Sequence, residues 1–373
     1  MKLLALGILL GVGVAATPSV ATASPSTLDR KLVTKKVRTV TVFGHRGASG
    51  YRPEHTLAAY RLAIAQGADV IEPDVVSTKD GVLVARHENE ISGTTDVADH
   101  PEFADRKATK TTDGTAVTGW FTEDFTLAEL KTLRAKERLP QVRPGNTIYD
   151  GRFEVPTLDE VIALAKSESR RLGRRIAIAP ETKHPTYFRS IGLPLEKPLL
   201  RSLRHAGWDR SDAPVYVQSF ETTNLKEIAR WSRVRLVQLT SASGAPYDLV
   251  AQGDPTTYAD LMSPAGLKGV ARYARWIGPD KASVIPRAAD GTLGDPTGLV
   301  EDAHRAGLKV VAYTFRAENQ FLPVDYRSGG GLAAQGDLAG ELRAYFATGL
   351  DGVFSDFPDI AFAARKDWYR ARR

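Results

Sequence analysis

Alternation between short apolar runs and helical segments is the feature that most constrains the fold of this 373-residue chain. The apolar runs are typical of β-strands, and most of them are separated by segments with helical periodicity. Such alternation favours a parallel sheet whose crossovers are helices. The sequence therefore predicts an α/β fold, a (β/α)8 TIM barrel. The predicted strands are residues 40–44, 69–76, 82–87, 175–181, 215–219, 235–239, 309–315 and 352–355.

The segments between these runs supply the predicted helices. An open doubly wound sheet is the alternative, and it is disfavoured because the chain has no GxGxxG or GxxxxGK phosphate loop. Residues 241–285 are less regular and are expected to form a long connection that contains one helix. The predicted helices are residues 56–66, 126–134, 157–167, 194–205, 223–231, 267–275, 299–306, 338–348 and 360–370.

Residues 88–155 interrupt the alternation. They are rich in Thr, Asp and Gly and show little apolar periodicity. A structureless loop of this length is uncommon in a compact domain, so we expect a small cap inserted after the third strand, over one face of the barrel. The aromatic side chains of Trp120, Phe121 and Phe125 are expected either to pack inside this cap or to help select the substrate.

The N-terminus has the pattern of an export signal. Lys2 precedes an apolar stretch over residues 3–16, and Ala21-Thr22-Ala23 offers a small-residue cleavage site. We expect residues 1–23 to be a signal peptide, with an uncleaved anchor as the alternative. Residues 24–37 are expected to be a loose leader and residues 38–373 the barrel domain. The predicted location is secreted or periplasmic, and the absence of cysteine excludes disulfides.

Composition limits the partners. The 42% hydrophobic and 25% charged residues fit a globular protein. The net charge of +6 favours anionic ligands, but 50 basic residues are nearly balanced by 44 acidic ones. No basic run is interleaved with aromatic residues, so nucleic acid is not an expected partner. We expect a small-molecule substrate, no integral membrane association, and a monomer or dimer.

Three acidic residues are candidate metal ligands. Glu72 and Asp74 are two residues apart on a predicted strand, so their side chains should share one face. Adjacent carboxylates repel each other unless a cation lies between them. Glu181 ends the fourth predicted strand and can complete an all-oxygen site, which suits Ca²⁺ or Mg²⁺. The alternative is that these are solvated acids at strand ends.

Two histidines and two fixed cations lie at neighbouring strand ends. His45 and His87 are candidates for a general acid and a general base, because imidazole titrates near neutral pH. Arg46 and Lys183 can bind a phosphate. Glu54 lies on the first loop and is a candidate metal ligand, a partner of Arg46 or a helix cap. The other histidines, His184 among them, are expected to be structural.

Several motifs together resemble the glycerophosphodiester phosphodiesterase family. They occur in family order from residue 43 to 359. They are Gly44-His45-Arg46-Gly47, Arg52-Pro53-Glu54-His55-Thr56, Glu72-Pro73-Asp74, His87, Glu181-Thr182-Lys183, Gln218-Ser219-Phe220 and Asp351-Gly352-Val353-Phe354-Ser355-Asp356-Phe357-Pro358. The exported members with a mid-barrel insertion look most similar. Many members have Asp after the third-strand histidine and Arg before a Thr pair, where this chain has Glu88 and Gly93.

The resemblance implies a metal-dependent TIM barrel that cleaves glycerophosphodiesters to an alcohol and sn-glycerol 3-phosphate. It implies His45 and His87 as the catalytic pair and Arg46 and Lys183 as phosphate contacts. It implies one divalent cation, with Ca²⁺ favoured over Mg²⁺, held by Glu72, Asp74 and Glu181. Glu54, Gln218 and Phe220 are candidates for supporting residues.

Some alternatives stay open at this point. A phospholipase D-like activity on whole lipids and the hydrolysis of teichoic acid are the alternative enzymatic functions. A non-catalytic binding protein is disfavoured because both histidines are present. The sequence does not assign the acid and the base, and it does not decide whether water or the substrate's own hydroxyl attacks.

Overall fold

The structure is a computed structural model that describes residues 39–372. The predicted signal peptide, residues 1–23, and the predicted leader, residues 24–37, lie outside the described residues. No helix between residues 39 and 372 is long and apolar enough to cross a membrane.

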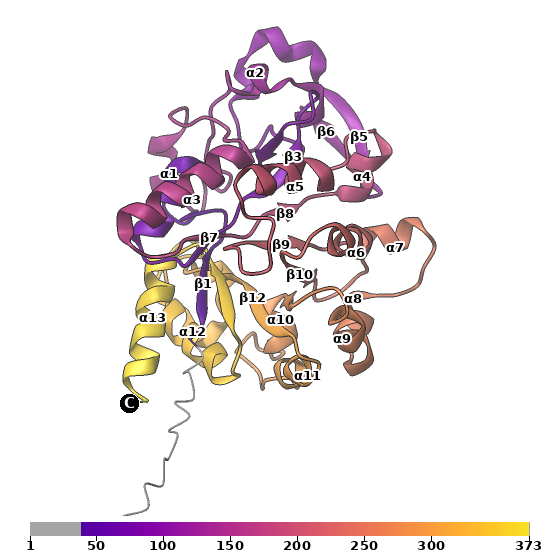
Figure 1. Ribbon diagram of the computed structural model, residues 1–373. Coiled ribbons are helices and arrows are strands. Elements are labelled where there is room, and N and C mark those ends of the chain that lie inside the picture. Colours follow the sequence, from indigo (N-terminus) through magenta and orange to yellow (C-terminus); the bar gives the residue numbers. More distant parts are fainter. Residues whose placement is uncertain (1–38, 373) are drawn as a thin grey trace, which may run out of the picture. The chain divides into compact units, whose positions relative to one another are not determined.

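Parallel strands among helices form the centre of the fold (Figure 1), and their pairings close into a ring, so the predicted TIM barrel is confirmed. The strand β1 (Thr41–Gly44) pairs on one side with β13 (Gly352–Ser355) and on the other with β2 (Val70–Ile71). Pairing then continues around the ring back to β13. The remaining ring strands are β3 (Asp74–Ser77), β7 (Ala177–Ile178), β8 (Glu181–Thr182), β9 (Tyr216–Ser219), β10 (Arg235–Thr240), β11 (Trp276–Pro279) and β12 (Lys309–Phe315).

Two of the predicted strands are each broken at a proline. Residues 69–76 form β2 and β3 with Pro73 between them, and residues 175–181 form β7 and β8 with Pro180 between them. Proline has no N–H to donate to a sheet ladder, so the ladder is interrupted there. β2 pairs with β7, and β3 pairs with β8, so the two broken strands run side by side. Each break lies directly before a carboxylate, Asp74 or Glu181.

Residues 82–87 are predicted to form the third barrel strand, and this prediction is wrong. These residues form β4 (Leu83–Ala85), which pairs antiparallel with β3 and is not a barrel strand. The three-residue turn 79–81 explains this, because a parallel return needs a longer crossover. The eighth barrel strand is instead β11, inside the stretch 241–285 that was expected to be an irregular connection. Its sequence Trp276-Ile277-Gly278-Pro279 is too short and too interrupted to be recognised as a strand.

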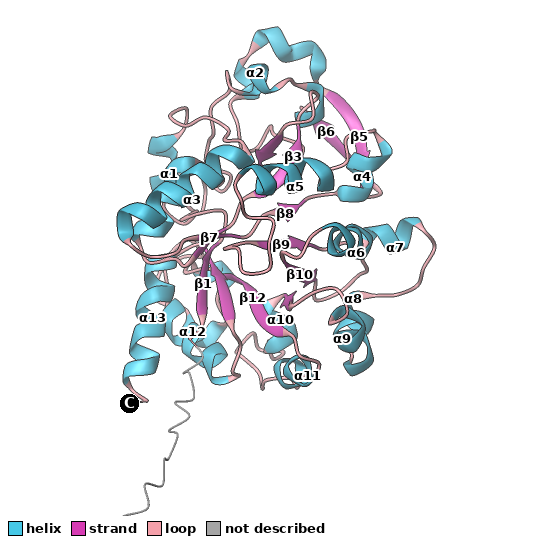
Figure 2. Ribbon diagram, viewed as in Figure 1, coloured by secondary structure: helices cyan, strands magenta, loops and turns pink. Residues whose placement is uncertain are grey.

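Helices surround the barrel, and most of the predicted ones are present (Figure 2). The first begins after the cap residue Thr56, whose side chain accepts a hydrogen bond from the Ala59 N–H. The principal helices are α1 (Leu57–Ala65), α3 (Leu158–Leu172), α5 (Glu196–His205), α6 (Thr222–Trp231), α9 (Pro264–Val270), α11 (Leu299–Arg305), α12 (Leu338–Ala347) and α13 (Pro358–Arg370). The shorter helices are α2 (Leu127–Leu130), α4 (Pro185–Ser190), α7 (Tyr247–Ala251), α8 (Tyr258–Met262) and α10 (Lys281–Val284).

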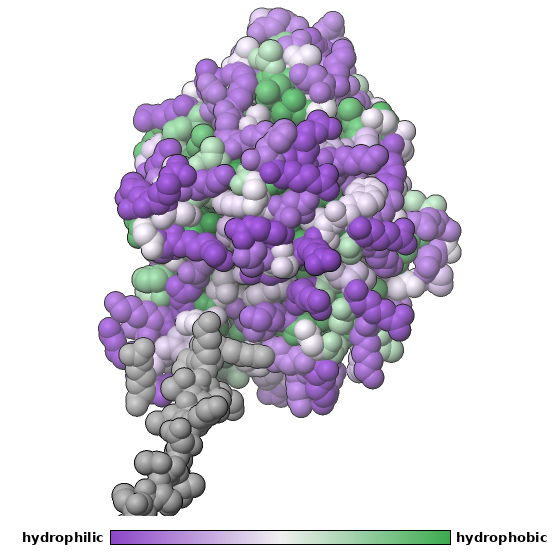
Figure 3. All heavy atoms as spheres, in the orientation of Figure 1, coloured by the Kyte–Doolittle hydropathy of each residue, from purple (hydrophilic) through white to green (hydrophobic). Residues whose placement is uncertain are grey.

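Apolar side chains are packed in two places. One cluster fills the inside of the barrel, and its members are Phe43, Val70, Ala177, Ala179, Val237, Leu239, Trp276, Val311 and Phe354. A larger cluster lies between the barrel and its helices and includes Ile64, Leu199 and Phe315. The face shown in Figure 3 is mostly hydrophilic, with apolar side chains scattered over it. Burial of apolar surface in these two layers is the main source of stability.

Residues 88–155, which we call the 88–155 segment, lie between the second and third barrel strands. They contain α2 and an antiparallel hairpin of β5 (Ala108–Thr112) and β6 (Thr115–Gly119), with several short 3₁₀ turns. These elements lie together at one end of the described part of the chain in Figure 1. Trp120, Phe121 and Phe125 are buried and line neither cavity described below, so they pack in the interior.

Candidate active site

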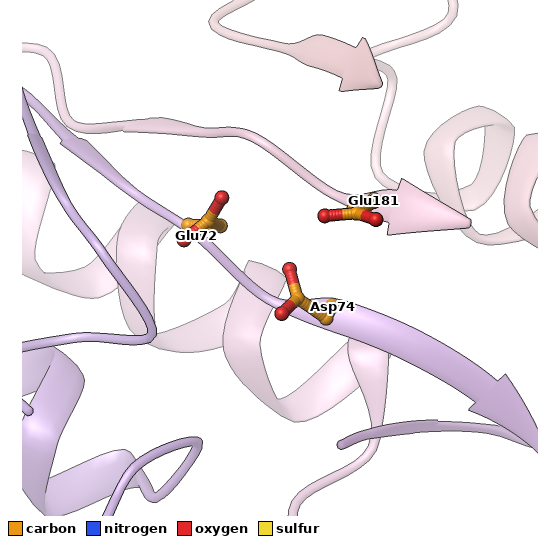
Figure 4. Close-up of side chains that lie close together, drawn as sticks. All are labelled: Glu72, Asp74 and Glu181. Atoms are coloured by element: carbon orange, nitrogen blue, oxygen red, sulfur yellow. The ribbon is translucent and has the colours of Figure 1, made fainter. Parts of the chain in front are cut away.

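Three buried carboxylates converge at the prolines that interrupt two neighbouring barrel strands. Glu72 follows β2, Asp74 begins β3 and Glu181 begins β8. Asp74 and Glu181 are direct partners across the sheet, so they lie at one level of the barrel. One ligand oxygen of each residue lies within 4.8 Å of the other two, and Figure 4 shows the three groups facing a common space.

Polar neighbours fix the orientation of each carboxylate. Gln218, the sheet partner of Glu181, donates its Nε2–H to Glu72 Oε1 at 2.7 Å. His55 Nε2 lies 3.0 Å from Asp74 Oδ2, and Lys183 Nζ lies 3.1 Å from Glu181 Oε1. The other Asp74 oxygen, Oδ1, is buried and has no hydrogen-bond partner among the described residues. It is therefore available as a ligand inside the cluster.

The electrostatics of this cluster call for a cation. Burial and the repulsion of Asp74 and Glu181 raise the pKa of Glu72 well above its usual value. Burial likewise raises the pKa of Glu181 to about 7, although Lys183 opposes this. Burial also disfavours ionisation of Asp74, but His55 and Arg46 outweigh it and hold that pKa below its usual value. A divalent cation would favour the ionised form of all three and remove the repulsion.

Metal-free protein is expected to lose stability as the pH rises from about 5 to 7. In that window Glu181 holds a proton in the folded chain, with a pKa of about 7, but loses it in the unfolded chain, where the value is 4.5. The folded state then binds more protons, so the free energy of unfolding falls with rising pH. The loss should be on the order of 3 kcal/mol.

The measurement is urea unfolding of metal-free wild type and Glu181→Gln between pH 5 and 8. Glutamine does not titrate, so the difference between the two proteins isolates this carboxylate. Wild type should weaken relative to the variant as the pH rises. Parallel pH profiles for the two proteins would contradict the prediction.

His45 lies directly after β1, against the carboxylate cluster. Its Nε2 is 3.9 Å from Glu72 Oε2, and its Nδ1 is 2.5 Å from Asp356 Oδ1. Burial lowers the pKa of His45 to about 4, against the opposing effect of the Asp356 carboxylate. The ring therefore has one nitrogen on a carboxylate and the other facing the site.

His87 lies two residues beyond β4 and faces the same site from another direction. Its Nε2 is 3.4 Å from Lys183 Nζ, and its Nδ1 is 2.6 Å from Glu88 Oε1. Burial, followed by the positive charges of Arg46 and Lys183, lowers the pKa of His87 to about 3. Although β4 is not a barrel strand, its antiparallel return from β3 still places His87 near Asp74 and Glu181.

Arg46 is held in an unusual backbone conformation, with a φ of 56°. Its backbone N–H donates to Glu72 Oε2 at 3.0 Å, and its Nη1 donates to Glu54 Oε1 at 3.0 Å. The next residue, Gly47, must be glycine, because its φ is 91° and a Cβ there would lie 2.7 Å from Ala59. Glu54 is thus a partner of Arg46, one of its three expected roles, and it is not in the carboxylate cluster.

Two neighbouring hollows, which share several lining residues, open onto these groups. One has a volume of about 460 Å³ and is lined by both histidines, Arg46 and all three carboxylates. The other, of about 530 Å³, is lined by His87, Lys183 and the rings of Tyr258 and Tyr313. Phe220 lines both hollows, 5.8 Å from the Tyr313 ring. The structure therefore brings together His45, His87, Glu72, Asp74, Glu181, Arg46, Lys183, Gln218 and Phe220, with Glu54 behind Arg46.

Several site residues were not singled out from the sequence. His55 and Asp356 belong to the family motifs, but the motifs alone give their side chains no role. Arg143 and Arg316 bind Asp356 and carry no local signal. His184 was expected to be structural, yet it lies between Glu88 and Asp113 at the edge of the site. Asp356 follows directly after a barrel strand, and this position in the sequence is a signal by which such a site residue can be identified.

Comparison with known proteins adds a family and several relatives. Residues 45–360 match the glycerophosphoryl diester phosphodiesterase family. A glycerophosphodiester phosphodiesterase of Arabidopsis thaliana is 37% identical over 325 residues, which cover 84% of this chain and 82% of the relative. A glycerophosphodiester phosphodiesterase of Haemophilus influenzae is 29% identical over 342 residues, which cover 85% of this chain and 87% of the relative.

Solved structures share the fold. A phosphodiesterase of Oleispira antarctica, solved in complex with the product sn-glycerol-3-phosphate, superposes with a TM-score of 0.56 at 22% identity and covers 88% of this chain and 97% of its own. A glycerophosphodiester phosphodiesterase of Agrobacterium tumefaciens has a TM-score of 0.53 at 19% identity, with coverage of 86% and 99%.

Proposed function

The chain belongs to the glycerophosphoryl diester phosphodiesterase family, and from that premise we propose that it hydrolyses glycerophosphodiesters to an alcohol and sn-glycerol 3-phosphate. One bound divalent cation and a histidine pair, His45 and His87, complete the proposal. The observation that carries it is that both imidazoles and the carboxylate cluster line one cavity. The relatives named above are phosphodiesterases of this kind, and the ligand in the Oleispira structure is the product that this reaction would release.

The residues that would hold the cation are Glu72, Asp74 and Glu181. They are three buried oxygen donors with an unpartnered oxygen among them, which fits a hard cation. We propose Ca²⁺ in preference to Mg²⁺, because Mg²⁺ usually binds only one or two protein carboxylates and keeps several waters. Such a cation, when bound, neutralises charge on the phosphate oxygens.

Arg46 and Lys183 are placed to bind the phosphodiester. Both side chains are buried. Arg46 lines the first hollow, Lys183 lines the second, and Glu181 lines both. Arg46 keeps its Nε free of hydrogen bonds in the described structure, although this atom is buried. A phosphate oxygen would give that N–H a partner. Buried cations aimed at developing negative charge stabilise a transition state more strongly than exposed ones do.

The histidines supply the proton transfers. A carboxylate at each Nδ1 turns each Nε2 toward the substrate site, where His87 Nε2 also contacts Lys183 Nζ at 3.4 Å. The neutral imidazole of the pair takes a proton from the attacking oxygen as the new P–O bond forms. With pKa values of about 4 and 3 both rings are neutral near pH 7 before substrate binds, so the acid takes up its proton in the substrate complex, where the negative charge of the phosphate favours the imidazolium. That imidazolium gives its proton to the leaving alcohol as the old P–O bond breaks. Either water or the substrate's glycerol hydroxyl can be the attacking oxygen in this scheme.

We also propose that the enzyme acts outside the cytoplasm. The support is the N-terminal sequence pattern of Lys2, the apolar stretch 3–16 and Ala21-Thr22-Ala23. Expression with this leader should release a chain that begins at Ser24, which N-terminal sequencing of the culture medium or periplasm can detect. A full-length chain confined to the cells would contradict the proposal.

A substrate screen tests the activity. Glycerophosphocholine, glycerophosphoethanolamine and glycerophosphoglycerol should each release sn-glycerol 3-phosphate, and a chelator should stop the release. The product is measured with a coupled glycerol-3-phosphate dehydrogenase assay. Whole phospholipids and a poly(glycerophosphate) teichoic acid are included as competing substrates. Turnover of either of these with none of the small diesters would overturn the proposal.

A further inference from the structure

Each of the two histidines is attached to a carboxylate through the nitrogen that faces away from the site. His45 Nδ1 is 2.5 Å from Asp356 Oδ1, and His87 Nδ1 is 2.6 Å from Glu88 Oε1. A carboxylate in this position fixes the ring orientation and keeps the proton on Nδ1. It can do so only if the carboxylate itself is prevented from rotating. The groups that hold the two carboxylates are therefore important for the acid/base pair.

The carboxylate of Asp356 is held by a residue of the 88–155 segment. Arg143 Nη2 lies 2.5 Å from Asp356 Oδ2, and Arg143 Nε lies 2.6 Å from Glu318 Oε1. The same guanidinium donates from Nη1 to the Ser49 carbonyl at 2.9 Å. All of these groups are buried. A second cation, Arg316, also binds Asp356 Oδ2, with its Nε at 3.0 Å.

The carboxylate of Glu88 is held through a longer chain of contacts that ends in the same segment. Glu88 Oε2 lies 2.8 Å from His184 Nε2, and His184 Nδ1 lies 2.6 Å from Asp113 Oδ2. Asp113 is in the turn between β5 and β6. Glu88 is itself the first residue of the 88–155 segment, and its side chain is half-exposed. The His87 connection is therefore less enclosed than the His45 connection.

A third contact joins this segment to the phosphate-binding group. Arg138 Nε lies 2.8 Å from Glu54 Oε2, and the other oxygen of Glu54 accepts from Arg46. Arg143, Asp113 and Arg138 of this segment thus connect to three different groups of the site, each through one or two intervening side chains. A segment that only covered the barrel would not need contacts with the acidic side chains that hold both imidazoles.

We propose that the 88–155 segment positions the acid/base pair. Arg143 acts on His45 through Asp356, and Asp113 acts on His87 through His184 and Glu88. These are positioning residues, because neither Arg143 nor Asp113 touches the reacting atoms. The inference rests on the proposed function for its kinetic consequence, but the ring orientation and tautomer of each histidine can be measured without turnover.

The experiment compares Arg143→Met and Asp113→Asn with a matched control, Arg106→Met. Arg106 belongs to the same segment, and its ion pair with Glu129, 2.7 Å, lies within that segment. Asparagine suits position 113, where φ is 48°, because Asn adopts this conformation readily. Each test variant should lower kcat by about 10–100-fold with little change in KM, as expected when a supporting hydrogen bond is lost. The control should match wild type.

¹⁵N NMR of the imidazoles reports which ring nitrogen carries the proton. A purely structural role of Arg143 or Asp113 would leave these signals unchanged. In wild type both rings should carry the proton on Nδ1. Arg143→Met should alter the His45 signals only, and Asp113→Asn the His87 signals only. Signals are assigned with His45→Gln and His87→Gln.

Removing Arg143 leaves buried carboxylates without their cation, so a more conservative variant accompanies it. If Arg143→Met does not fold, Arg143→Lys keeps the charge and should give a smaller loss of kcat. Test variants that match Arg106→Met in both kcat and NMR signals would overturn the inference. If wild type turns over no glycerophosphodiester, the proposed function fails, and the NMR comparison still decides the positioning role.

Discussion

Replacement of His45 or His87 by alanine is expected to lower kcat by about 10²–10⁴-fold, the range for losing one general acid or base. Both rings line the cavity that holds the carboxylate cluster, and each presents Nε2 to it. No other histidine of the described chain lines that cavity. The double variant should lose less than the product of the two single losses, because groups that act as a unit are not additive.

The matched control is His100→Ala, which removes a histidine whose ion pair with Glu102 is 3.0 Å long and lies away from the cavity. It should keep wild-type kcat. A substrate with a p-nitrophenolate leaving group needs little protonation, so it should rescue only the variant that lacks the acid, and this identifies the acid. If both single variants kept more than about a tenth of wild-type turnover, the loss would be smaller than the expected range, and the two-histidine scheme would be abandoned.

Much of the fold and the grouping of candidate site residues followed from local patterns in the sequence. Glu72, Asp74 and Glu181 follow or begin apolar runs, and strand ends of a parallel barrel converge on one face. That argument needs only the order of strands and the direction in which they run. It held even though Pro73 and Pro180 interrupt the strands, because the interrupted halves still pair side by side.

Other features depend on pairing between distant residues and could not be read in this way. β11 is a strand because its neighbours β10 and β12 supply hydrogen-bond partners on both sides, whereas its own four residues carry a glycine and a proline. The run 82–87 looked like a barrel strand, but its short turn permits only a return alongside β3. Arg143 is 213 residues away from Asp356 along the chain, and nothing near it indicates that partner.

The charged residues show the same difference between what local sequence predicts and what depends on distant contacts. Arg46, Lys183 and the three carboxylates could be grouped from sequence, but the order of contacts among them could not. The structure shows that Arg46 forms an ion pair with Glu54 and that Lys183 forms one with Glu181. Buried ions need such partners, because an isolated buried charge costs several kcal/mol. Arg46 and Lys183, the proposed phosphate-binding cations, are therefore held in place before a substrate arrives, which would reduce the reorganisation needed during the proposed reaction.

Removal of bound divalent cation is expected to abolish turnover, and Asp74→Asn is expected to have nearly the same effect. Asp74 contributes the buried oxygen that lacks a partner in the described structure, so it is the ligand whose loss the neighbouring groups can compensate least. Dialysis against a chelator should remove activity, and Ca²⁺ should restore it. Ca²⁺ should also raise the stability of wild type by about 2.7 kcal/mol when its concentration is 100 times Kd, and should leave Asp74→Asn unchanged.

The stability measurement makes this prediction independent of the assay. Glu123→Gln is the matched control, because Glu123 is also a buried carboxylate but lies outside the cluster, against Lys110 and Tyr187. It should keep the Ca²⁺-dependent rise in Tm. Without metal, Asp74→Asn should be less stable than wild type, because His55 and Arg46 stabilise the ionised Asp74 carboxylate in the folded chain, so the effect of Ca²⁺ is measured as a difference within each protein. Full turnover after exhaustive chelation, or equal stabilisation of wild type and Asp74→Asn by Ca²⁺, would show that these carboxylates do not form the metal site.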